Sequence, residues 1–267
     1  MRGPPDGFRL ILQPKMEGRL NMAIDEALVE SVGISRSAQT VRLYGFSPPT
    51  LSLGRFQKVH GLLATERLRQ DGVTLVRRPT GGHAVLHDME LSYSVVLSKL
   101  LIGQRLGDAR KQTIYHFIAT LLLAGLGKIG IAGRINSVRQ GDLRNPDCFR
   151  SSGEFEITSA DARKLIGSAQ MTTRTVVLQH GSVPLVNTGR RVSRYLSTPE
   201  PANSREPTSL NDLSGRSLNF EEVQSAFAVA FREGLDAEES DLSKEEQECA
   251  GRILTEKYSS DSWNLAS

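Results

Sequence analysis

The spacing of apolar residues near the start of the chain predicts a helix over residues 19–32. One face carries a continuous apolar stripe, and Gly33 provides the end of the helix. The stripe consists of Leu20, Ile24, Ala27 and Leu28. Three acidic residues, Asp25, Glu26 and Glu30, lie off this stripe. The segment is therefore an amphipathic helix that packs one side against a core.

Most of the chain that follows has the pattern of short strands. β-Branched and aromatic residues gather in short runs, which turn residues such as Pro48 and Pro49 separate. The predicted strands are residues 40–44, 50–53, 73–78, 84–97, 154–158, 164–170 and 175–185. Helical spacing returns at 108–124, and a loop rich in Ser, Pro and Asn follows the last strand from 188 to 216.

The C-terminal part of the chain is predicted to be helical. An apolar stripe is followed by a capping box formed by Ser243 and Glu246. The stripe consists of Phe220, Val223, Phe227 and Phe231. Helices thus bracket a block of hairpin-linked strands, which predicts an α+β fold with a mixed, largely antiparallel β-sheet flanked by helices. We expect residues 1–216 to form the core and residues 217–267 to pack on the same domain.

Composition restricts the setting of this 267-residue chain. No run approaches the ~18 apolar residues of a membrane span, and the first residues have Pro, Asp and Gly where a secretory signal is apolar. We therefore expect a cytoplasmic protein with no membrane partner. The charge is uneven: residues 221–248 carry a net −8, while residues 1–220 carry +11. A basic body suggests an anionic partner, but no Lys/Arg cluster with interleaved aromatics favours nucleic acid.

Two short motifs are not supported by their structural context, and a third is absent. GLGKIG at 125–130 matches a dinucleotide fingerprint, but it follows a helix instead of a strand, so Gly125 is better explained as a helix cap. His83 and His87 have metal-ligand spacing for a helix, but in a strand four residues span about 13 Å. The sequence has no P-loop motif. We expect neither a metal nor a bound cofactor.

RRPTGGHAVLHD, residues 77–88, is the first segment with candidate chemistry. Gly81 and Gly82 permit backbone geometries closed to other residues and let a ligand approach the main chain. Arg77 and Arg78 are suited to hold a phosphate or carboxyl oxygen. An ordinary hairpin turn with surface arginines explains the same residues equally well.

The two cysteines differ in their surroundings. Cys148 lies in a polar, proline-containing loop, whereas Cys249 lies in a helical segment and is expected to pack. A free cysteine is most often an inert buried side chain. However, Lys164 follows Cys148 by 16 residues across a predicted hairpin. An ammonium beside a thiol favours the thiolate, which is the nucleophilic form.

Together these segments resemble the biotin/lipoate protein ligase and octanoyltransferase superfamily. The resemblance is carried by LNMAIDEAL, VRLYGFSPPTLSLGRFQ, RRPTGGHAVLHDMELSYSVV, KLIGSAQ and LQHGSVPL, across roughly residues 18–186. Within the superfamily the chain is most similar to the cysteine-dependent octanoyl-[acyl carrier protein]:protein octanoyltransferases. The resemblance implies transfer of octanoyl from octanoyl-acyl carrier protein to a lysine of a lipoyl domain, such as glycine-cleavage H protein or a dehydrogenase E2.

The resemblance also implies roles for individual residues. Cys148 matches the cysteine that carries the acyl thioester, and Lys164 matches the lysine that lowers its pKa and contacts the acyl carbonyl. The acyl-binding cleft is matched by Arg77, Arg78, Gly81, Gly82, His83 and His87. His83 and Phe46 depart from the family pattern, since arginine and tryptophan are common at these positions.

Two other activities remain open within the same superfamily. An ATP-dependent lipoate–protein ligase would activate free lipoate, but His83 breaks the ligase-like triple glycine. An amidotransferase would move acyl groups between lipoyl domains, and HDMELSYS, residues 87–94, fits the octanoyl branch better. A non-catalytic acyl-binding protein would need neither Cys148 nor Lys164.

Overall fold

The computed structural model describes residues 7–58, 61–136, 156–196 and 206–266. Cys148 lies outside these residues. Strands within them are β1 (Phe8–Met16), β2 (Gln39–Phe46), β3 (Thr50–Leu53), β4 (Thr74–Arg77), β5 (Val85–His87), β6 (Glu90–Ser98), β7 (Gly133–Ile135), β8 (Ile157–Ser159), β9 (Lys164–Thr172), β10 (Val176–Pro184) and β11 (Glu238–Glu239). Helices are α1 (Gly18–Gly33), α2 (Thr65–Gln70), α3 (Lys99–Leu106), α4 (Lys111–Lys128), α5 (Gly189–Val192), α6 (Leu210–Ser214), α7 (Phe220–Leu235), α8 (Lys244–Ile253), which continues as a π-helical turn (Leu254–Tyr258), and α9 (Asp261–Asn264).

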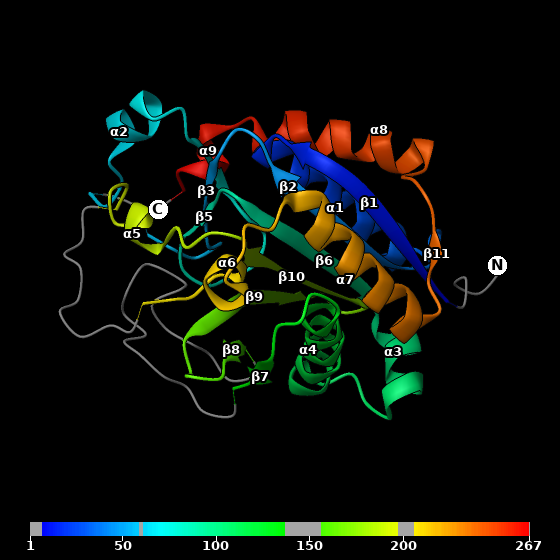
Figure 1. Cartoon of the computed structure of the whole chain (residues 1–267). Helices are drawn as coiled ribbons and strands as arrows, with labels where there is room; N and C mark the ends of the chain where they lie inside the picture. The colour runs from blue at the N-terminus through cyan, green and yellow to red at the C-terminus, as the bar shows by residue number, and fades with distance from the viewer. Residues whose placement is uncertain (1–6, 59–60, 137–155, 197–205, 267) are drawn as a thin grey trace.

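A large mixed sheet forms the centre of the molecule (Figure 1), with the strand order β11-β1-β2-β6-β10-β9-β8-β7. β1 runs parallel to β2 and β11, and the other neighbouring pairs are antiparallel. The predicted fold class is therefore confirmed. β1 was not predicted, because FRLILQPKM has no regular alternation of apolar and polar residues along its length.

Helices cover both faces of this sheet (Figure 1). α4 and α7 pack over one face, and α1 and α8 pack over the other. Phe227 and Phe231 of α7 belong to the first core, and Ala250 and Ile253 of α8 belong to the second. Helices beyond residue 217 thus bury their apolar sides against elements from the preceding part of the chain, and the boundary at 216/217 stays a prediction.

A second, three-stranded sheet has the order β4-β3-β5 and its own small core. The sequence predicted one strand over 84–97, but the structure divides it into β5 and β6, which belong to different sheets. Met89, between them, has a φ of 50°, outside the range of a strand. The break carries the chain from the small sheet into the large one, and the strands on either side contribute to the candidate site.

α4 continues past the end predicted from the sequence. Gly125 was expected to cap a helix, but it lies inside α4, and this prediction is wrong. A Cβ on Gly125 would lie 2.8 Å from the Phe227 ring, so glycine permits close packing of α4 against α7. Gly130, with a φ of 75°, follows the helix end instead. GLGKIG is therefore a packing and termination motif.

In the described ranges, no helix is long and apolar enough to span a membrane.

Candidate active site

A narrow pocket opens where the small sheet meets one end of the large sheet. Most of its lining is apolar surface, but polar side chains from both sheets reach it. The lining includes Met22 of α1, Tyr44, Ser52, Arg78, Val85, His87, Ser92, and residues 167–169 and 180–182 of β9 and β10. An apolar slot with a few convergent polar groups is the usual form of a small-ligand site.

Sheet register explains how these polar side chains meet. Arg42 pairs with Ser94 and Ser94 pairs with His180, so the three lie in one row across β2, β6 and β10. Directly opposite residues of neighbouring strands point to the same face. This face carries α1, and Asp25 on α1 contacts all three members of the row.

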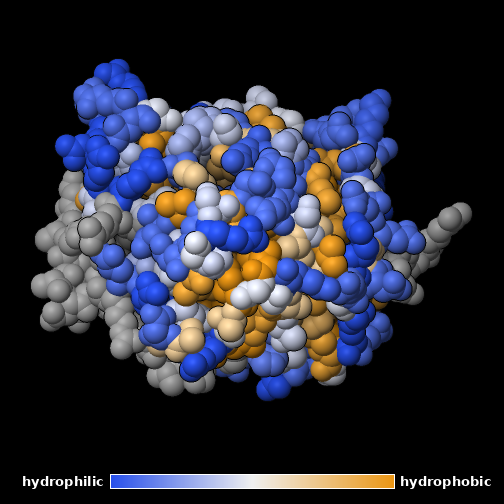
Figure 2. Space-filling model, in the orientation of Figure 1, coloured by the Kyte–Doolittle hydropathy of each residue, from blue (hydrophilic) through white to orange (hydrophobic). Residues whose placement is uncertain are grey.

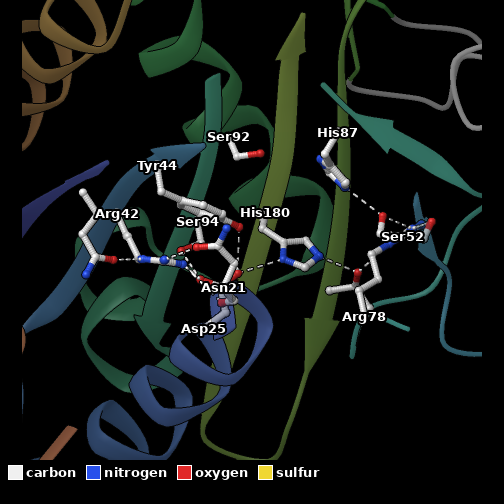
Figure 3. A network of polar contacts seen from close by, with 12 residues as sticks. Asn21, Asp25, Arg42, Tyr44, Ser52, Arg78, His87, Ser92, Ser94 and His180 are labelled. Atoms are coloured by element: carbon white, nitrogen blue, oxygen red, sulfur yellow. Dashed lines mark hydrogen bonds and ion pairs between the residues drawn. The ribbon is translucent and has the colours of Figure 1, made fainter. Parts of the chain in front are cut away.

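Asp25 is the most densely hydrogen-bonded carboxylate near the pocket (Figure 3), and it is fully buried. Arg42 Nη1 donates to Oδ1 at 2.8 Å, and Ser94 Oγ donates to the same oxygen at 2.8 Å. Tyr44 Oη lies 3.1 Å from Oδ2, as does His180 Nδ1. Burial alone would raise the pKa of Asp25, but the hydrogen bond from His180 and the charge of Arg42 hold it below its ordinary value.

His180 lies between Asp25 and the glycine-rich segment (Figure 3). Its Nε2 is 2.7 Å from Oγ1 of Thr80, on the side opposite Asp25. Burial lowers the pKa of His180 despite the neighbouring Asp25 carboxylate, and the charge of Arg78 lowers it further. The imidazole is therefore neutral at physiological pH, with one nitrogen donating and the other accepting.

His87, at the end of β5, also lines the pocket. Its Nε2 lies 2.8 Å from Ser52 Oγ, and its Nδ1 lies 2.6 Å from Glu90 Oε1. Phe46, the departure from the family pattern, stacks on the imidazole with ring centroids 4.1 Å apart. Ser182 Oγ also donates to Glu90, so this carboxylate is held from β10 as well.

Arg78 is the predicted residue that the structure places most centrally. It is buried and borders the pocket, and its Nη2 donates to the carbonyl oxygens of Gly81 and His83 at 2.8 and 2.7 Å. It thereby holds the turn around Gly82, which has a φ of 92°. A Cβ on Gly54 would lie 1.8 Å from the Gly82 carbonyl oxygen, so this loop must carry glycine to approach the turn.

Arg77 points away from this pocket. Its guanidinium donates to carbonyl oxygens of Gly54, Gln57 and Ala266, and its carbonyl accepts from Trp263 Nε1. These contacts join the small sheet to the C-terminal residues. The structure therefore brings Arg78, Gly81, His83 and His87 together and places the side chain of Arg77 elsewhere.

Lys164 begins β9, three residues before the pocket-lining Gly167. Its Nζ donates to Oε1 of Glu156 at 2.8 Å, and both side chains are at least nine-tenths buried. The carboxylate partner was not predicted. Cys148, the proposed nucleophile, lies outside the described residues, so its position relative to Lys164 stays a prediction.

Cys249 has a different environment on α8. Its Sγ lies 3.2 Å from Oε2 of Glu30, and the side chain packs partly against the core under α1. Burial and the Glu30 carboxylate raise the pKa of this thiol, which opposes formation of a thiolate. Among the residues that the structure describes, no cluster of His, Cys, Asp and Glu has the arrangement of a metal site.

Comparisons with known proteins agree with this architecture. The family model of the lipoyl protein ligase A/B catalytic domain matches residues 17–232. Octanoyltransferase LipM from Kyrpidia tusciae is 36% identical, with 96% of this chain and 98% of the relative covered. Octanoyltransferase LipM from Anoxybacillus flavithermus is 34% identical, with 97% and 98% covered.

Solved structures give the same fold at lower identity. Lipoate-protein ligase A bound with ATP superposes with a TM-score of 0.79 at 24% identity over 99% of both chains. The bipartite lipoate protein ligase from Thermoplasma acidophilum, studied with its E2 lipoyl domain, gives 0.76 at 23% identity over 97% of this chain and 96% of the other.

The chain belongs to the lipoyl protein ligase A/B catalytic domain family. It is an acyltransferase, the class of its full-length curated relatives. Asp25, Arg42, Tyr44 and Glu90 were not identified from the sequence as site residues, and His180 appeared only within the LQHGS motif. That motif and the acidic LNMAIDEAL helix were the available signals, but only the sheet register brings them together.

Proposed function

We propose that this acyltransferase moves an octanoyl group from octanoyl-acyl carrier protein to a lysine of a lipoyl domain, in lipoate biosynthesis. The full-length similarity to octanoyltransferases supports the acyl group. The T. acidophilum ligase, which was studied together with its E2 lipoyl domain, supports a lipoyl domain as acceptor. Glycine-cleavage H protein and dehydrogenase E2 proteins are the acceptors to test.

The observation that carries the proposed chemistry is the buried ammonium of Lys164. Its strand continues directly into the pocket wall at residues 167–169. A buried cation there favours negative charge nearby, whether on a thiolate or on the oxygen of an acyl carbonyl under attack. Glu156 shares this cation, so it also fixes where the ammonium lies.

We assign the two transfer steps to Cys148. Its thiolate attacks the octanoyl thioester carbonyl, a new thioester forms, and the carrier protein leaves as a thiolate that takes up a proton. The neutral amine of the acceptor lysine then attacks the Cys148 thioester. An amide bond forms, the cysteine leaves as a thiolate, and the amine loses one proton to solvent.

The donor in this scheme is already activated. A thioester has enough reactivity for transfer to an amine, so neither ATP nor a metal is needed to form an adenylate. The octanoyl chain occupies the apolar slot between Met22, Val85 and residues 167–169. Arg78 and His87 line this slot, and Gly81, Gly82 and His83 belong to the turn that Arg78 holds.

One assay tests this function. Octanoyl-carrier protein and apo lipoyl domain are incubated with the enzyme in EDTA, without ATP, and octanoylated acceptor is measured by mass spectrometry. We expect transfer under these conditions and none from free octanoate. Strict dependence on ATP with free lipoate or octanoate would contradict the proposal and indicate a ligase. Transfer only from an octanoylated lipoyl domain would indicate an amidotransferase.

A further inference from the structure

Two hydrogen-bond relays diverge from Arg78 to two buried carboxylates. The His180 relay comprises Arg78, Thr80, His180 and Asp25, with contacts of 3.2, 2.7 and 3.1 Å. The His87 relay comprises Arg78, Ser52, His87 and Glu90, with contacts of 3.2, 2.8 and 2.6 Å. Each relay runs from guanidinium through hydroxyl and imidazole to carboxylate. Figure 3 shows His180 beside Asp25 and His87 beside Ser52.

The groups at the two ends of the His180 relay determine which atom donates each of its hydrogen bonds. Arg78 can only donate, so Nε–H donates to Thr80 Oγ1. The depressed pKa of Asp25 keeps it a carboxylate, which only accepts, so His180 Nδ1 must carry the proton. In a neutral imidazole Nε2 then accepts, and the Thr80 hydroxyl proton points to it.

The hydrogen-bond donors of the His87 relay are assigned in the same way. Arg78 Nη1 donates to Ser52 Oγ, and Glu90 as a carboxylate accepts from His87 Nδ1. When the His87 ring carries one proton, its Nε2 then accepts the Ser52 hydroxyl proton. The hydrogen-bond geometry therefore favours the Nδ1–H tautomer for both rings. An Asp that accepts from Nδ1–H is a known way to hold an imidazole in one tautomer.

Arg78 has all of its N–H groups committed inside the protein. An arginine has five such donors. One reaches Thr80, two reach the backbone and side chain of Ser52, and two reach the carbonyls of Gly81 and His83. Direct binding of a substrate oxygen would require one of these hydrogen bonds to break.

We propose that His180 and His87 are positioning residues that act through Thr80 and Ser52 on Arg78. The two relays fix the guanidinium at Nε and at Nη1, and its Nη2 in turn fixes the carbonyls of Gly81 and His83. Arg78 borders the pocket, and its N–H groups support the turn instead of binding a substrate oxygen. The effect on turnover rests on the proposed function, whereas the tautomers do not.

The tautomers are tested by ¹⁵N NMR of the imidazole nitrogens in the full-length protein near neutral pH. We expect protonated Nδ1 and unprotonated Nε2 at both His180 and His87. Asp25→Asn, if it folds, should move His180 to the Nε2–H form and leave His87 unchanged. A protonated Nε2 with unprotonated Nδ1 at His180 in the wild type would overturn the proposal.

The effect on turnover is tested at Thr80 with two matched variants. Thr80→Val keeps the volume and removes the hydroxyl, whereas Thr80→Ser keeps the hydroxyl and removes a methyl group. Thr80→Val loses both hydrogen bonds of the hydroxyl, to Arg78 and to His180, which should lower kcat for octanoyl transfer by about tenfold or more, with KM for the lipoyl domain unchanged. Thr80→Ser should retain near-wild-type kcat.

Three results distinguish failure of the positioning role from failure of the proposed function. Wild-type kcat in Thr80→Val overturns the positioning role, and so does an equal loss of kcat in Thr80→Ser and Thr80→Val. If the wild-type protein transfers no octanoyl group at all, the proposed function fails. The NMR measurement then still decides whether the relays have the inferred direction.

Discussion

Lys164 Nζ lies 2.8 Å from Oε1 of Glu156, and the two side chains are buried together. A buried ammonium without a partner is costly, so the carboxylate permits Lys164 to remain charged in this position. The same carboxylate competes with any thiolate or oxyanion for that charge. Lys164 therefore has a structural role and a proposed catalytic role, and experiments must separate them.

Lys164→Ala is expected to affect both stability and turnover. It leaves Glu156 buried without this ion pair, which should lower the free energy of unfolding by about 3–5 kcal/mol in urea titrations. Loss of a group that stabilises the oxyanion should lower turnover about 10²–10³-fold. The pH dependence of Cys148 alkylation should also shift toward the pKa of a free thiol, about 8.5.

The double variant Lys164→Met/Glu156→Leu separates the two roles. Replacing both members of a buried ion pair by apolar residues of similar size is often neutral for stability. We expect the double variant to regain stability but not turnover. Recovery of both would show that Lys164 is needed only for folding and would remove it from the mechanism.

Gly54→Ala should disrupt the small sheet and the site together. The added Cβ would overlap the Gly82 carbonyl oxygen, so the two loops must separate, at a cost of about 1–3 kcal/mol in unfolding free energy. Octanoyl transfer should fall as well. Gly127→Ala is the matched control, because nothing lies within 4 Å of its Cβ and it lies inside α4. It should be neutral or stabilising by about 0.5–1 kcal/mol.

Stability should fall in two steps as the pH is lowered. His180 has a depressed pKa in the folded protein, so below about 6.5 the unfolded chain binds a proton that the folded chain does not. Asp25 also has a depressed pKa, which gives a second loss below about 3.9. Each group contributes a slope of at most about 1.4 kcal/mol per pH unit within its window.

Urea unfolding across pH in the wild type and His180→Asn checks the upper step. Asparagine does not titrate, so the variant should have a shallower dependence of unfolding free energy on pH below about 6.5. The separate dependence below about 3.9, which comes from Asp25, should remain. Identical slopes in the two proteins would show that burial does not hold His180 neutral.

Local patterns in the sequence predicted the long helices α1, α4, α7 and α8 and most strands. They missed the short helices α2 and α3, and α5 and α6 lie within the segment 188–216 that was predicted to be a loop. They also did not show where chain segments change direction. The run 84–97 is apolar and β-branched throughout, yet the chain turns at Met89 and enters a second sheet. Gly125 was interpreted as a helix end, but the structure uses glycine there to contact Phe227. This contact joins residues far apart in the sequence, so local spacing does not reveal it. Both outcomes depend on tertiary packing, which local spacing does not contain.

The site was predictable only where its residues lie in one motif. Arg78, Gly81, Gly82 and His87 follow one another closely and were identified together. Asp25 was placed off the apolar stripe of its helix, but it is buried because Arg42 and His180 meet it there. His180 is 155 positions away, and only the register of β2, β6 and β10 aligns the partners.

The most direct test of the account is the mass of the protein after incubation with octanoyl-carrier protein alone. We expect one octanoyl group on Cys148, labile to hydroxylamine, and no adduct in Cys148→Ala. Cys249→Ala should still form it, since Glu30 and burial raise the pKa of that thiol. An undiminished adduct in Cys148→Ala, or octanoyl transfer by that variant at the wild-type rate, would contradict the proposed thioester mechanism.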